Sequence, residues 1–318
     1  MKQVLVTGGA GFIGSHVVDA LLERRMKVTV LDDFSTGSLK NLGEAPRAGL
    51  TVVQGDIASR AAHRLVVELR PDAILMLAAQ PSVKVSMRDP TLDAHTNLLG
   101  LVNLLEAARA TSCRKVVFAS SGGTIYGDVS PERLPIQEHE PRRACSFYGL
   151  TKLTALSYLE LYREHFGLNY AALALGNVYG PRQSPDGEAG VIAIFAKRIL
   201  NGEPCVVNGD GLTTRDYVYV TDVANAFVAA LERGSGLINL GTGQEASVLE
   251  IHAQLSRSAG SSRAPNLGPA LPGEVRRVSL DPRRAAAELG WAPTMALGAG
   301  IDRVLSWMRE QHLRTEVA

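Results

Sequence analysis

The chain has 318 residues, which is enough for about two domains. Its 33 Lys and Arg nearly balance its 32 Asp and Glu, so the formal charge of +1 argues against a nucleic-acid binder. The three cysteines show no CxxC spacing and the seven histidines no HExxH pattern, which predicts neither a disulfide framework nor a metal site. No apolar run reaches the ~18 residues that span a bilayer, and the N-terminus does not resemble a signal peptide. We therefore expect a cytoplasmic protein without a membrane partner.

The first half of the chain alternates short apolar runs with stretches of helical periodicity. The runs predict strands at 4–7, 27–31, 51–54, 73–77 and 115–119. The periodic stretches predict helices at 12–24, 60–69, 91–111 and 147–166. Strands that are apolar on both faces, with helices between them, indicate an α/β fold with a doubly wound parallel sheet of the Rossmann type.

The rhythm changes near residue 175, beyond which Pro and Gly become dense. This composition predicts a smaller, loop-rich lobe, which we expect to be α/β and to hold the substrate. We expect residues 1–175 to form the sheet domain, with 212–242 returning to it. Residues 176–211 and 243–318 are then expected to form the substrate lobe.

A glycine-rich turn follows the first predicted strand. Gly8, Gly11 and Gly14 form GxxGxxG, which permits a tight turn and lets backbone N–H groups approach a pyrophosphate at a helix N-terminus. A phosphate-loop ATPase motif would need Lys followed by Ser or Thr where this chain has Ser15 and His16, so that interpretation fails.

Carboxylates end the next two predicted strands. Asp32 and Asp33 end the second strand, where a carboxylate binds the ribose hydroxyls of NAD and repels the 2′-phosphate of NADP. Asp56 and Ile57 end the third strand, where an adenine amino group could bind. An Asp in that position is also common as a simple helix cap.

Tyr148 and Lys152 form a YxxxK pattern on the predicted helix 147–166. Residues four apart lie on one face of a helix, so the phenol and the ammonium share one space. A nearby positive charge favours the phenolate, which makes this tyrosine a candidate general base.

These motifs resemble those of the extended short-chain dehydrogenase/reductase superfamily. Further matches lie at 120–127 (SSGGTIYG), 177–182 (NVYGPR), 209–211 (GDG), 215–222 (RDYVYVTD), 272–274 (PGE) and 289–291 (LGW). Over residues 2–310 the chain is similar to the nucleotide-sugar epimerases and dehydratases of this superfamily, above all to its UDP-glucose/UDP-galactose 4-epimerases.

The resemblance implies an isomerase that uses NAD to invert C4 of a UDP-sugar through a transient 4-keto intermediate. Tyr148 would exchange the proton of the 4-OH, Lys152 would hold the nicotinamide ribose and stabilise the phenolate, and Ser121 or Thr124 would complete the catalytic set. Implied NAD contacts are Gly8, Gly11, Phe12, Ile13, Gly14, Asp32, Asp33, Ser35, Asp56, Ile57, Ala78, Ala79, Gln80, Asn97, Ser120, Tyr148 and Lys152. Implied substrate contacts are Lys84, Ser121, Thr124, Asn177, Val191, Arg215 and Arg276.

The chain departs from the family pattern at two places. Gly122 stands at the position of the family's catalytic Ser or Thr, and we hypothesise that Thr124, rather than Ser121, supplies the missing hydroxyl. Leu271 stands where family members often carry an arginine for the diphosphate. Arg215 is then the better phosphate candidate and Arg276 a second one, because a guanidinium matches phosphate with paired donors.

Three other functions stay open from the sequence. A UDP-glucuronate 4-epimerase is the main alternative, since Ser120, Ser121 and Thr124 could bind a C5 carboxylate, although Asn177 favours a neutral sugar. A nucleotide-sugar dehydratase would need an Asp-Glu pair where this chain has Gly123 and Thr124. A non-catalytic NAD-binding sensor would typically lack the Tyr or the Lys of YxxxK.

The resemblance also implies a homodimer, built through a four-helix bundle to which each subunit contributes two helices. The candidates are 91–111 and 147–166. Their apolar positions suit either a core or an interface: Leu98, Leu101, Val102, Leu105, Leu153, Leu156 and Leu161.

Overall fold

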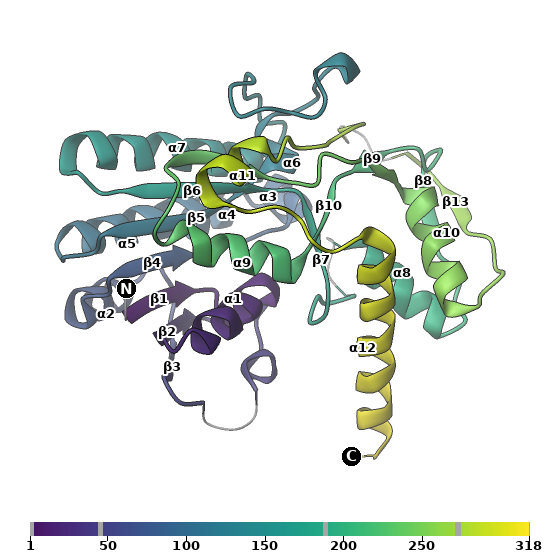
Figure 1. The fold of residues 1–318 in the computed structure, drawn as a ribbon, viewed down its shortest axis with the longest axis horizontal. Helices are drawn as coiled ribbons and strands as arrows, with labels where there is room; N and C mark the ends of the chain where they lie inside the picture. The colour runs from purple at the N-terminus through teal and green to yellow at the C-terminus, as the bar shows by residue number, and fades with distance from the viewer. Residues whose placement is uncertain (1–2, 44–46, 187–189, 271–274, 318) are drawn as a thin grey trace.

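The computed structural model describes residues 3–43, 47–186, 190–270 and 275–317. Seven parallel strands form the central sheet (Figure 1). Their order across the sheet is β11 (Gly236–Leu240), β6 (Tyr170–Leu175), β5 (Lys115–Ser121), β4 (Ala73–Met76), β1 (Gln3–Thr7), β2 (Lys27–Asp32) and β3 (Leu50–Gln54). The five predicted strands each agree with an observed strand to within two residues at either end.

Helices cover both faces of the sheet, and each face has its own buried cluster. On one face, α1 (Phe12–Glu23) packs beside α9 (Val220–Ala230), around Val17, Leu21 and Phe227. The other face carries α2 (Arg60–Leu69), α5 (Gly100–Arg109) and α7 (Phe147–Phe166), around Leu105 and Leu159. The doubly wound parallel fold expected from the alternating elements is thereby confirmed.

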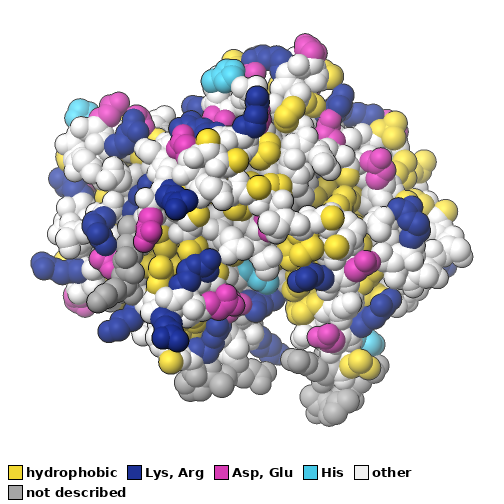
Figure 2. Space-filling model, in the orientation of Figure 1, with side chains coloured by type: hydrophobic (Ala, Val, Ile, Leu, Met, Phe, Trp, Pro, Cys, Tyr) yellow, Lys and Arg dark blue, Asp and Glu magenta, His cyan; other side chains and the backbone are white. Residues whose placement is uncertain are grey.

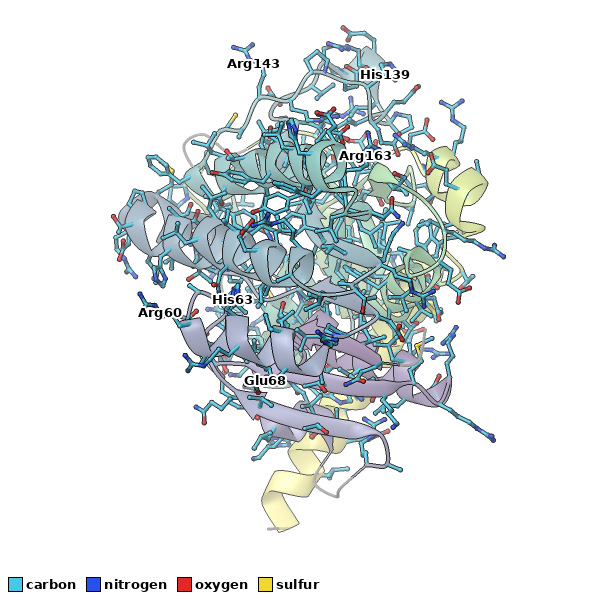
Figure 3. The ribbon with its side chains drawn as sticks, turned by 90° about the vertical axis from the view of Figure 1, so that its left-hand side faces the viewer. Arg60, His63, Glu68, His139, Arg143 and Arg163 are labelled. Atoms are coloured by element: carbon cyan, nitrogen blue, oxygen red, sulfur yellow. The ribbon has the colours of Figure 1, made fainter. Side chains whose placement is uncertain are left out.

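The predicted helix 91–111 is one helical run in three parts. It starts as α4 (Pro90–Ala94), continues through a π-helical turn, η2 (His95–Leu99), and ends as α5. The remaining short helices are η1 (Leu39–Leu42), α3 (Val83–Arg88), α6 (Gly122–Ile125) and η3 (Pro131–Arg133). η3 lies in the segment between α6 and α7. Figure 3 shows His139 and Arg143 of this segment at the outside of the molecule, away from the strands.

A smaller lobe lies beside the sheet and has its own apolar core. Its strands pair as β7 (Asn177–Tyr179) with β10 (Tyr217–Tyr219), β8 (Val206–Asn208) with β13 (Asn266–Gly268), and β9 (Thr214–Arg215) with β12 (Ala246–Ser247). The helices α8 (Val191–Leu200), α10 (Val248–Ala259) and α12 (Leu297–Val317) enclose a core that includes Phe195, Ile251 and Leu305.

The expected assignment of all of 243–318 to this lobe is wrong for one stretch. Val278 and Leu280 are buried in the cluster on the α7 face of the sheet. The next helix, α11 (Arg283–Leu289), and Trp291 belong to the cluster on the α9 face. The stretch therefore returns to the sheet domain, as α9 and β11 do. Sequence periodicity did not predict the return of this stretch to the sheet domain, because the stretch contains only a seven-residue helix and isolated apolar positions.

The surface in Figure 2 carries basic and acidic side chains interspersed, in keeping with the net charge of +1. Within the described ranges, no helix has both the length and the apolarity needed to cross a bilayer.

Candidate functional site

The turn between β1 and α1 brings backbone segments into close contact. Gly8 has φ +68°, and a Cβ on it would lie 2.6 Å from the backbone nitrogen of Ala78 at the end of β4. A Cβ on Gly14 would lie 2.0 Å from the carbonyl oxygen of Gly8. Both positions therefore need glycine. Gly11 is the N-cap of α1 and has no side-chain acceptor, so the first turn of this helix can receive a phosphate.

Asp32, the last residue of β2, is 6% exposed and holds this turn in place. Its Oδ2 accepts a hydrogen bond from the N–H of Ala10 (2.8 Å) and its Oδ1 one from that of Phe34 (2.9 Å). A carboxylate has about four lone-pair sites, so Asp32 can also accept from ribose hydroxyls. Asp33 is exposed, and its Oδ1 accepts from the N–H and the hydroxyl of Ser35.

Asp56 and Ile57 lie in the turn between β3 and α2. The Oδ1 atom of Asp56 accepts from the N–H of Ala58 (2.8 Å), and Ser59 is the N-cap of α2. Ile57 is buried against Gly100, where a Cβ would come within 2.6 Å of its side chain. Asp56 is exposed, so of the two it is the residue whose side chain remains accessible to a ligand.

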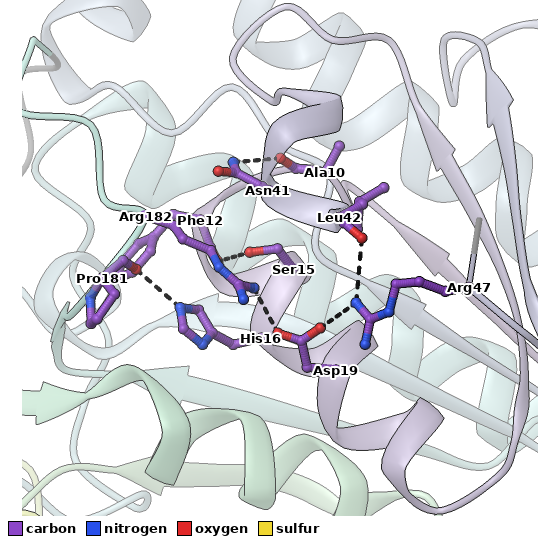
Figure 4. Close-up of polar contacts among 10 residues, drawn as sticks. All are labelled: Ala10, Phe12, Ser15, His16, Asp19, Asn41, Leu42, Arg47, Pro181 and Arg182. Atoms are coloured by element: carbon purple, nitrogen blue, oxygen red, sulfur yellow. Dashed lines mark hydrogen bonds and ion pairs between the residues drawn. The ribbon is translucent and has the colours of Figure 1, made fainter. Parts of the chain in front are cut away.

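The outer side of α1 is bonded to Pro181 and Arg182, the end of the NVYGPR segment that begins with β7 (Figure 4). Asp19 pairs with Arg47 through Oδ1 (2.5 Å) and with Arg182 through Oδ2 (2.7 Å). One turn earlier, His16 Nε2 lies 3.0 Å from the carbonyl oxygen of Pro181. Burial lowers the pKa of His16, so a neutral imidazole donates to this carbonyl. These contacts connect the helix of the glycine turn to the chain that leads into α8.

Tyr148 and Lys152 lie one turn apart at the start of α7, which is capped by the Ser146 hydroxyl. Lys152 is 3% exposed, and its Nζ donates to the carbonyl oxygen of Ala119 on β5 (2.9 Å). The same Nζ lies 4.6 Å from the ring centroid of Phe118 and 5.7 Å from that of Tyr148. The predicted juxtaposition of phenol and ammonium is therefore present.

Burial shifts the pKa values of both groups toward their neutral forms. It raises the pKa of Tyr148 to about 12, against a hydrogen bond with the Ser121 hydroxyl that lowers it. It lowers the pKa of Lys152 to about 8, while the charge of Asp93 acts in the opposite direction. At neutral pH the site thus holds a phenol beside an ammonium, and additional positive charge is needed to favour the phenolate.

The hydroxyl that hydrogen-bonds to Tyr148 is that of Ser121. The role hypothesised for Thr124, a hydrogen bond to the substrate, stays a prediction. The Oγ1 atom of Thr124 lies 3.5 Å from the carbonyl oxygen of Ser121. Gly122 cannot carry the hydroxyl, because a Cβ there would lie 2.4 Å from the Leu280 side chain and 3.2 Å from the carbonyl oxygen of Leu175. Leu280 occupies the space into which a serine at position 122 would extend.

Two further candidates lie near this strand end. Ser120 is 3% exposed, and its Oγ is a buried polar atom without a hydrogen-bond partner in the described structure. Asn177 is half-buried on β7, and its Oδ1 lies 3.8 Å from where a Cβ on Gly123 would be. The structure therefore brings together Ser120, Ser121, Tyr148, Lys152 and Asn177.

The two arginine candidates for the diphosphate differ in their surroundings. Arg276 forms a bidentate ion pair with the exposed carboxylate of Asp210 (2.9 and 2.5 Å). The pair lowers the pKa of the Asp210 carboxyl and balances the positive charge of the guanidinium. Arg215 is half-buried on β9, and its Nη1 donates to the carbonyl oxygen of Thr214 (2.7 Å). The preference for Arg215 as the phosphate-binding residue stays a prediction.

The other substrate candidates lie on separate elements. Val191 is the first residue of α8, whose N-cap, Gly190, has no side-chain acceptor. Lys84 is exposed on α3. The motif at 272–274 and the preceding Leu271 lie outside the described residues.

The aspartates of the RDYVYVTD motif are structural. Asp216 is fully buried and accepts from the N–H groups of Thr242, Gly243 and Leu280 and from the Thr242 hydroxyl. Asp222 accepts from the N–H and hydroxyl of Thr294 and from the N–H of Met295. Both carboxylates fix the returning C-terminal stretch against the sheet domain.

Sequence reasoning missed Asp93, which is fully buried between Gln80, Asn97 and Thr151. The signal was available, because Asp93 and Asn97 are polar residues four apart on a helix that is otherwise apolar on its inner face. Within the part of the chain that the structure describes, no group of three or more His, Cys, Asp or Glu side chains could hold a metal ion.

Comparison with known proteins agrees with this geometry. The profile of the "NAD dependent epimerase/dehydratase family" matches residues 4–241. A UDP-glucose 4-epimerase from Mycolicibacterium smegmatis is 43% identical over 312 residues, covering 97% of this chain and 99% of that protein.

Solved structures extend the likeness to three dimensions. The UDP-glucose 4-epimerase of Thermotoga maritima with UDP-glucose has a TM-score of 0.94 at 40% identity, covering 97% of this chain and 99% of that one. The UDP-glucose 4-epimerase of Thermus thermophilus in complex with NAD has a TM-score of 0.90 at 43% identity, with coverages of 97% and 99%. The motif resemblance is thus confirmed, and the chain belongs to the NAD dependent epimerase/dehydratase family.

Proposed function

We infer that the protein is an NAD-dependent isomerase that inverts C4 of a UDP-sugar, interconverting UDP-glucose and UDP-galactose. The observation that carries this inference is the cluster of Ser121, at the end of β5, with Tyr148 and Lys152 of α7. It lies on the same sheet edge as the glycine turn after β1, with only β4 between these two strands. The relatives of known name that match over nearly the whole chain support the same activity.

Three features of the chain fit NAD. The glycine turn leaves no room for a Cβ and opens onto the N-terminus of α1. Asp32 offers a carboxylate to ribose hydroxyls and would repel a 2′-phosphate. The unpartnered Oγ of Ser120 lies beside the reactive pair, on β5. When bound, NAD supplies a hydride acceptor and donor for C4 of the sugar.

The chain's own residues then handle the proton of the 4-OH. The Tyr148 hydroxyl accepts this proton as its phenolate and returns it at the end of the cycle. The Lys152 ammonium favours the phenolate, and the Ser121 hydroxyl, hydrogen-bonded to Tyr148, orients the oxygen that takes and gives the proton. One residue serves as base and as acid, so the protein ends each turnover in its starting state.

The second lobe supplies the contacts for the diphosphate in this proposal. Arg215 provides paired donors, and the uncapped first turn of α8 at Val191 provides backbone N–H groups. Asn177, beside Gly123, faces the sugar. Gly123 and Thr124 provide no carboxyl group, which disfavours the elimination of water.

We also propose a cytoplasmic homodimer. The outer faces of α4, η2 and α7 expose large apolar side chains, among them Leu99 (57%), Leu150 (49%) and Leu161 (50%). Such a face fits the expected four-helix bundle, in which a second copy covers it. Leu101, Leu105 and Leu156 are buried within the subunit and do not contribute. All three cysteines are free thiols, in keeping with a reducing compartment.

The test is a panel of UDP-galactose, UDP-N-acetylgalactosamine and UDP-galacturonate, assayed for the C4 epimer of each. We expect UDP-galactose to give the highest kcat/KM, with a Tyr148→Phe control reduced by about 10²–10⁴-fold. A preference for UDP-galacturonate would instead establish the uronate epimerase, and no turnover together with bound NAD would establish a sensor. For the dimer, Leu161→Glu is expected to yield monomers in light scattering, whereas Leu267→Glu on the exposed strand β13 is not.

A further inference from the structure

The turn that carries the Ser121 hydroxyl packs against a residue that lies far away in the chain. Ser121 is the last residue of β5, and Gly122 begins α6 directly after it. A Cβ on Gly122 would lie 2.4 Å from Cδ1 and 2.9 Å from Cδ2 of Leu280. The Leu280 side chain therefore packs directly on the backbone that follows Ser121.

Position 122 needs glycine because of this packing and not because of its backbone conformation. Gly122 is the first residue of a helix and lies outside the left-handed region of φ, so other residues could adopt its conformation. At the neighbouring Gly123, the nearest atom to a Cβ would be Asn177 Oδ1 at 3.8 Å, an ordinary contact. Of these two consecutive glycines, only Gly122 is in close contact with another side chain.

Leu280 is itself held firmly in place. It has no exposed surface, and its N–H donates to Asp216 Oδ2 (3.0 Å). It forms a parallel β-bridge with Ile136, in which the residues on either side of Leu280 share two hydrogen bonds of 2.8 Å with the Ile136 backbone. A Cβ on Gly241, directly after β11, would lie 2.6 Å from the Leu280 Cβ. These contacts prevent Leu280 from withdrawing from Gly122.

The far end of α6 is connected to the same β-bridge. Tyr126, the C-cap of α6, is buried, and its hydroxyl donates to Asn239 Oδ1 on β11 (2.8 Å). Asn239 Nδ2 donates in turn to the carbonyl oxygen of Ile136 (2.9 Å). Both ends of this short helix are therefore connected to the bridge between Ile136 and Leu280.

α6 also packs closely against the helix of the reactive pair. A Cβ on Gly149, next to Tyr148 on α7, would lie 2.7 Å from the carbonyl oxygen of Thr124. The turn from Ser121 to Thr124 is thus confined by Leu280 and by α7. Because a close-packed interior is hardly compressible, the volume of the Leu280 side chain affects where this turn lies.

We propose that Leu280 is a positioning residue of the epimerase site. Its side chain fills the space left by the missing side chain at position 122 and holds the turn between β5 and α6 where the Ser121 hydroxyl meets Tyr148. The role rests on the proposed function, because the hydrogen bond between Ser121 and Tyr148 serves the transfer of the 4-OH proton. Leu280 acts through Ser121 and contacts neither substrate nor cofactor in this proposal.

The first test compares two truncations in the same stretch. Leu280→Ala removes the contact with Gly122, and Val278→Ala is the matched control, because Val278 is buried in the same cluster. Both should lower the urea midpoint of unfolding, as large-to-small core substitutions do. Only Leu280→Ala is expected to lower kcat for UDP-galactose, by about 10–100-fold, because a small misplacement of a catalytic group is costly.

The kinetic parameters should separate positioning from general loss of structure. In Leu280→Ala, the KM for UDP-galactose should change by less than about threefold, because Leu280 does not bind the substrate. Leu280→Met has a similar volume and should keep most of the wild-type kcat. Leu280→Val makes a smaller cavity and repeats the comparison, with a smaller loss of kcat, if Leu280→Ala does not fold.

The second test asks whether Leu280 acts through Ser121. Adding Leu280→Ala to Ser121→Ala should lower kcat by no more than about twofold, because the hydroxyl that Leu280 positions is already absent. A full additional loss in the double variant would overturn the proposal. An unchanged kcat in Leu280→Ala, or an equal loss in Val278→Ala, would overturn it as well.

A structural readout does not depend on turnover. In a crystal structure of Leu280→Ala, the distance from Ser121 Oγ to Tyr148 Oη is expected to exceed about 3.5 Å, the limit of a hydrogen bond, whereas in Val278→Ala it should stay below it. An unmoved Ser121 hydroxyl in Leu280→Ala would contradict the positioning role. If the wild type turned over no UDP-sugar while this displacement was present, only the proposed function would fail.

Discussion

Asp216 offers a test of how the substrate lobe is held on the sheet domain. Its carboxylate accepts hydrogen bonds from the N–H groups of Thr242 (2.8 and 3.0 Å), Gly243 (3.0 Å) and Leu280 (3.0 Å). Asp216→Ala removes the acceptor for three backbone donors. An unsatisfied buried donor costs about 1–3 kcal/mol, so the unfolding free energy should fall by roughly 3 kcal/mol or more.

Two other variants separate charge from hydrogen bonding. Asp216→Asn retains one acceptor oxygen and should lose less stability than Asp216→Ala, about 1–2 kcal/mol, because charged hydrogen bonds are replaced by neutral ones. Asp210→Ala is the matched control, since that carboxylate is half exposed and its pair with Arg276 contributes about 1 kcal/mol at most.

Urea unfolding followed by tryptophan fluorescence measures these differences, because Trp291 is buried in the stretch that Asp216 and Asp222 hold. The neighbouring Arg215 should shift with the stretch, so we also expect a higher KM for UDP-glucose in Asp216→Asn. A loss of less than about 1 kcal/mol in Asp216→Ala would show that water satisfies the donors and that the carboxylate is not the anchor.

Three further predictions concern the site directly. Gly14→Ala places a Cβ 2.0 Å from the carbonyl oxygen of Gly8, so the purified protein should contain little NAD. Gly123→Ala is the control and should retain NAD, because a Cβ there has no neighbour closer than 3.8 Å. Equal amounts of NAD released from the two denatured variants would refute the binding of NAD at the glycine turn. Ser121→Ala should lower kcat by about 10²-fold and Thr124→Val by less than about tenfold; the reverse order in steady-state assays would return the hydroxyl role to Thr124. Arg215→Ala should raise the KM for UDP-glucose by about 10–100-fold. Arg276→Ala should change this KM by less than about threefold, because Asp210 already balances the charge of the Arg276 guanidinium. Similar KM values for the two arginine variants would contradict the assignment of the phosphate to Arg215.

The sheet could be predicted because its strands are continuous apolar runs, and helix 147–166 because its face is periodic over twenty residues. The juxtaposition of Tyr148 and Lys152 could also be predicted, since residues four apart lie on the same face of any α-helix. The hydroxyl partner could not be chosen, because Ser121 ends β5 while Thr124 lies on α6, and the sequence does not fix where the strand ends and the helix begins.

Other features depend on segments far apart in the sequence. Nothing near Arg276 indicates that Asp210 neutralises it, and nothing near Gly122 indicates that Leu280 fills the adjacent space. The carboxylate of Asp93 accepts from the Thr151 hydroxyl only because α4 and α7 pack together. Such pairings arise from tertiary packing, which a single sequence does not reveal.

The contact between Leu280 and Gly122 bears on how the protein is made. When the first 175 residues have left the ribosome, six of the seven strands exist, but β6 is an open edge that only β11 will cover. The space behind the reactive hydroxyl is closed only after residue 280 emerges. The nascent chain is thus exposed to misassembly for much of its synthesis, and a chain terminated after residue 242 would contain every strand of the sheet and the reactive pair without an enclosed site.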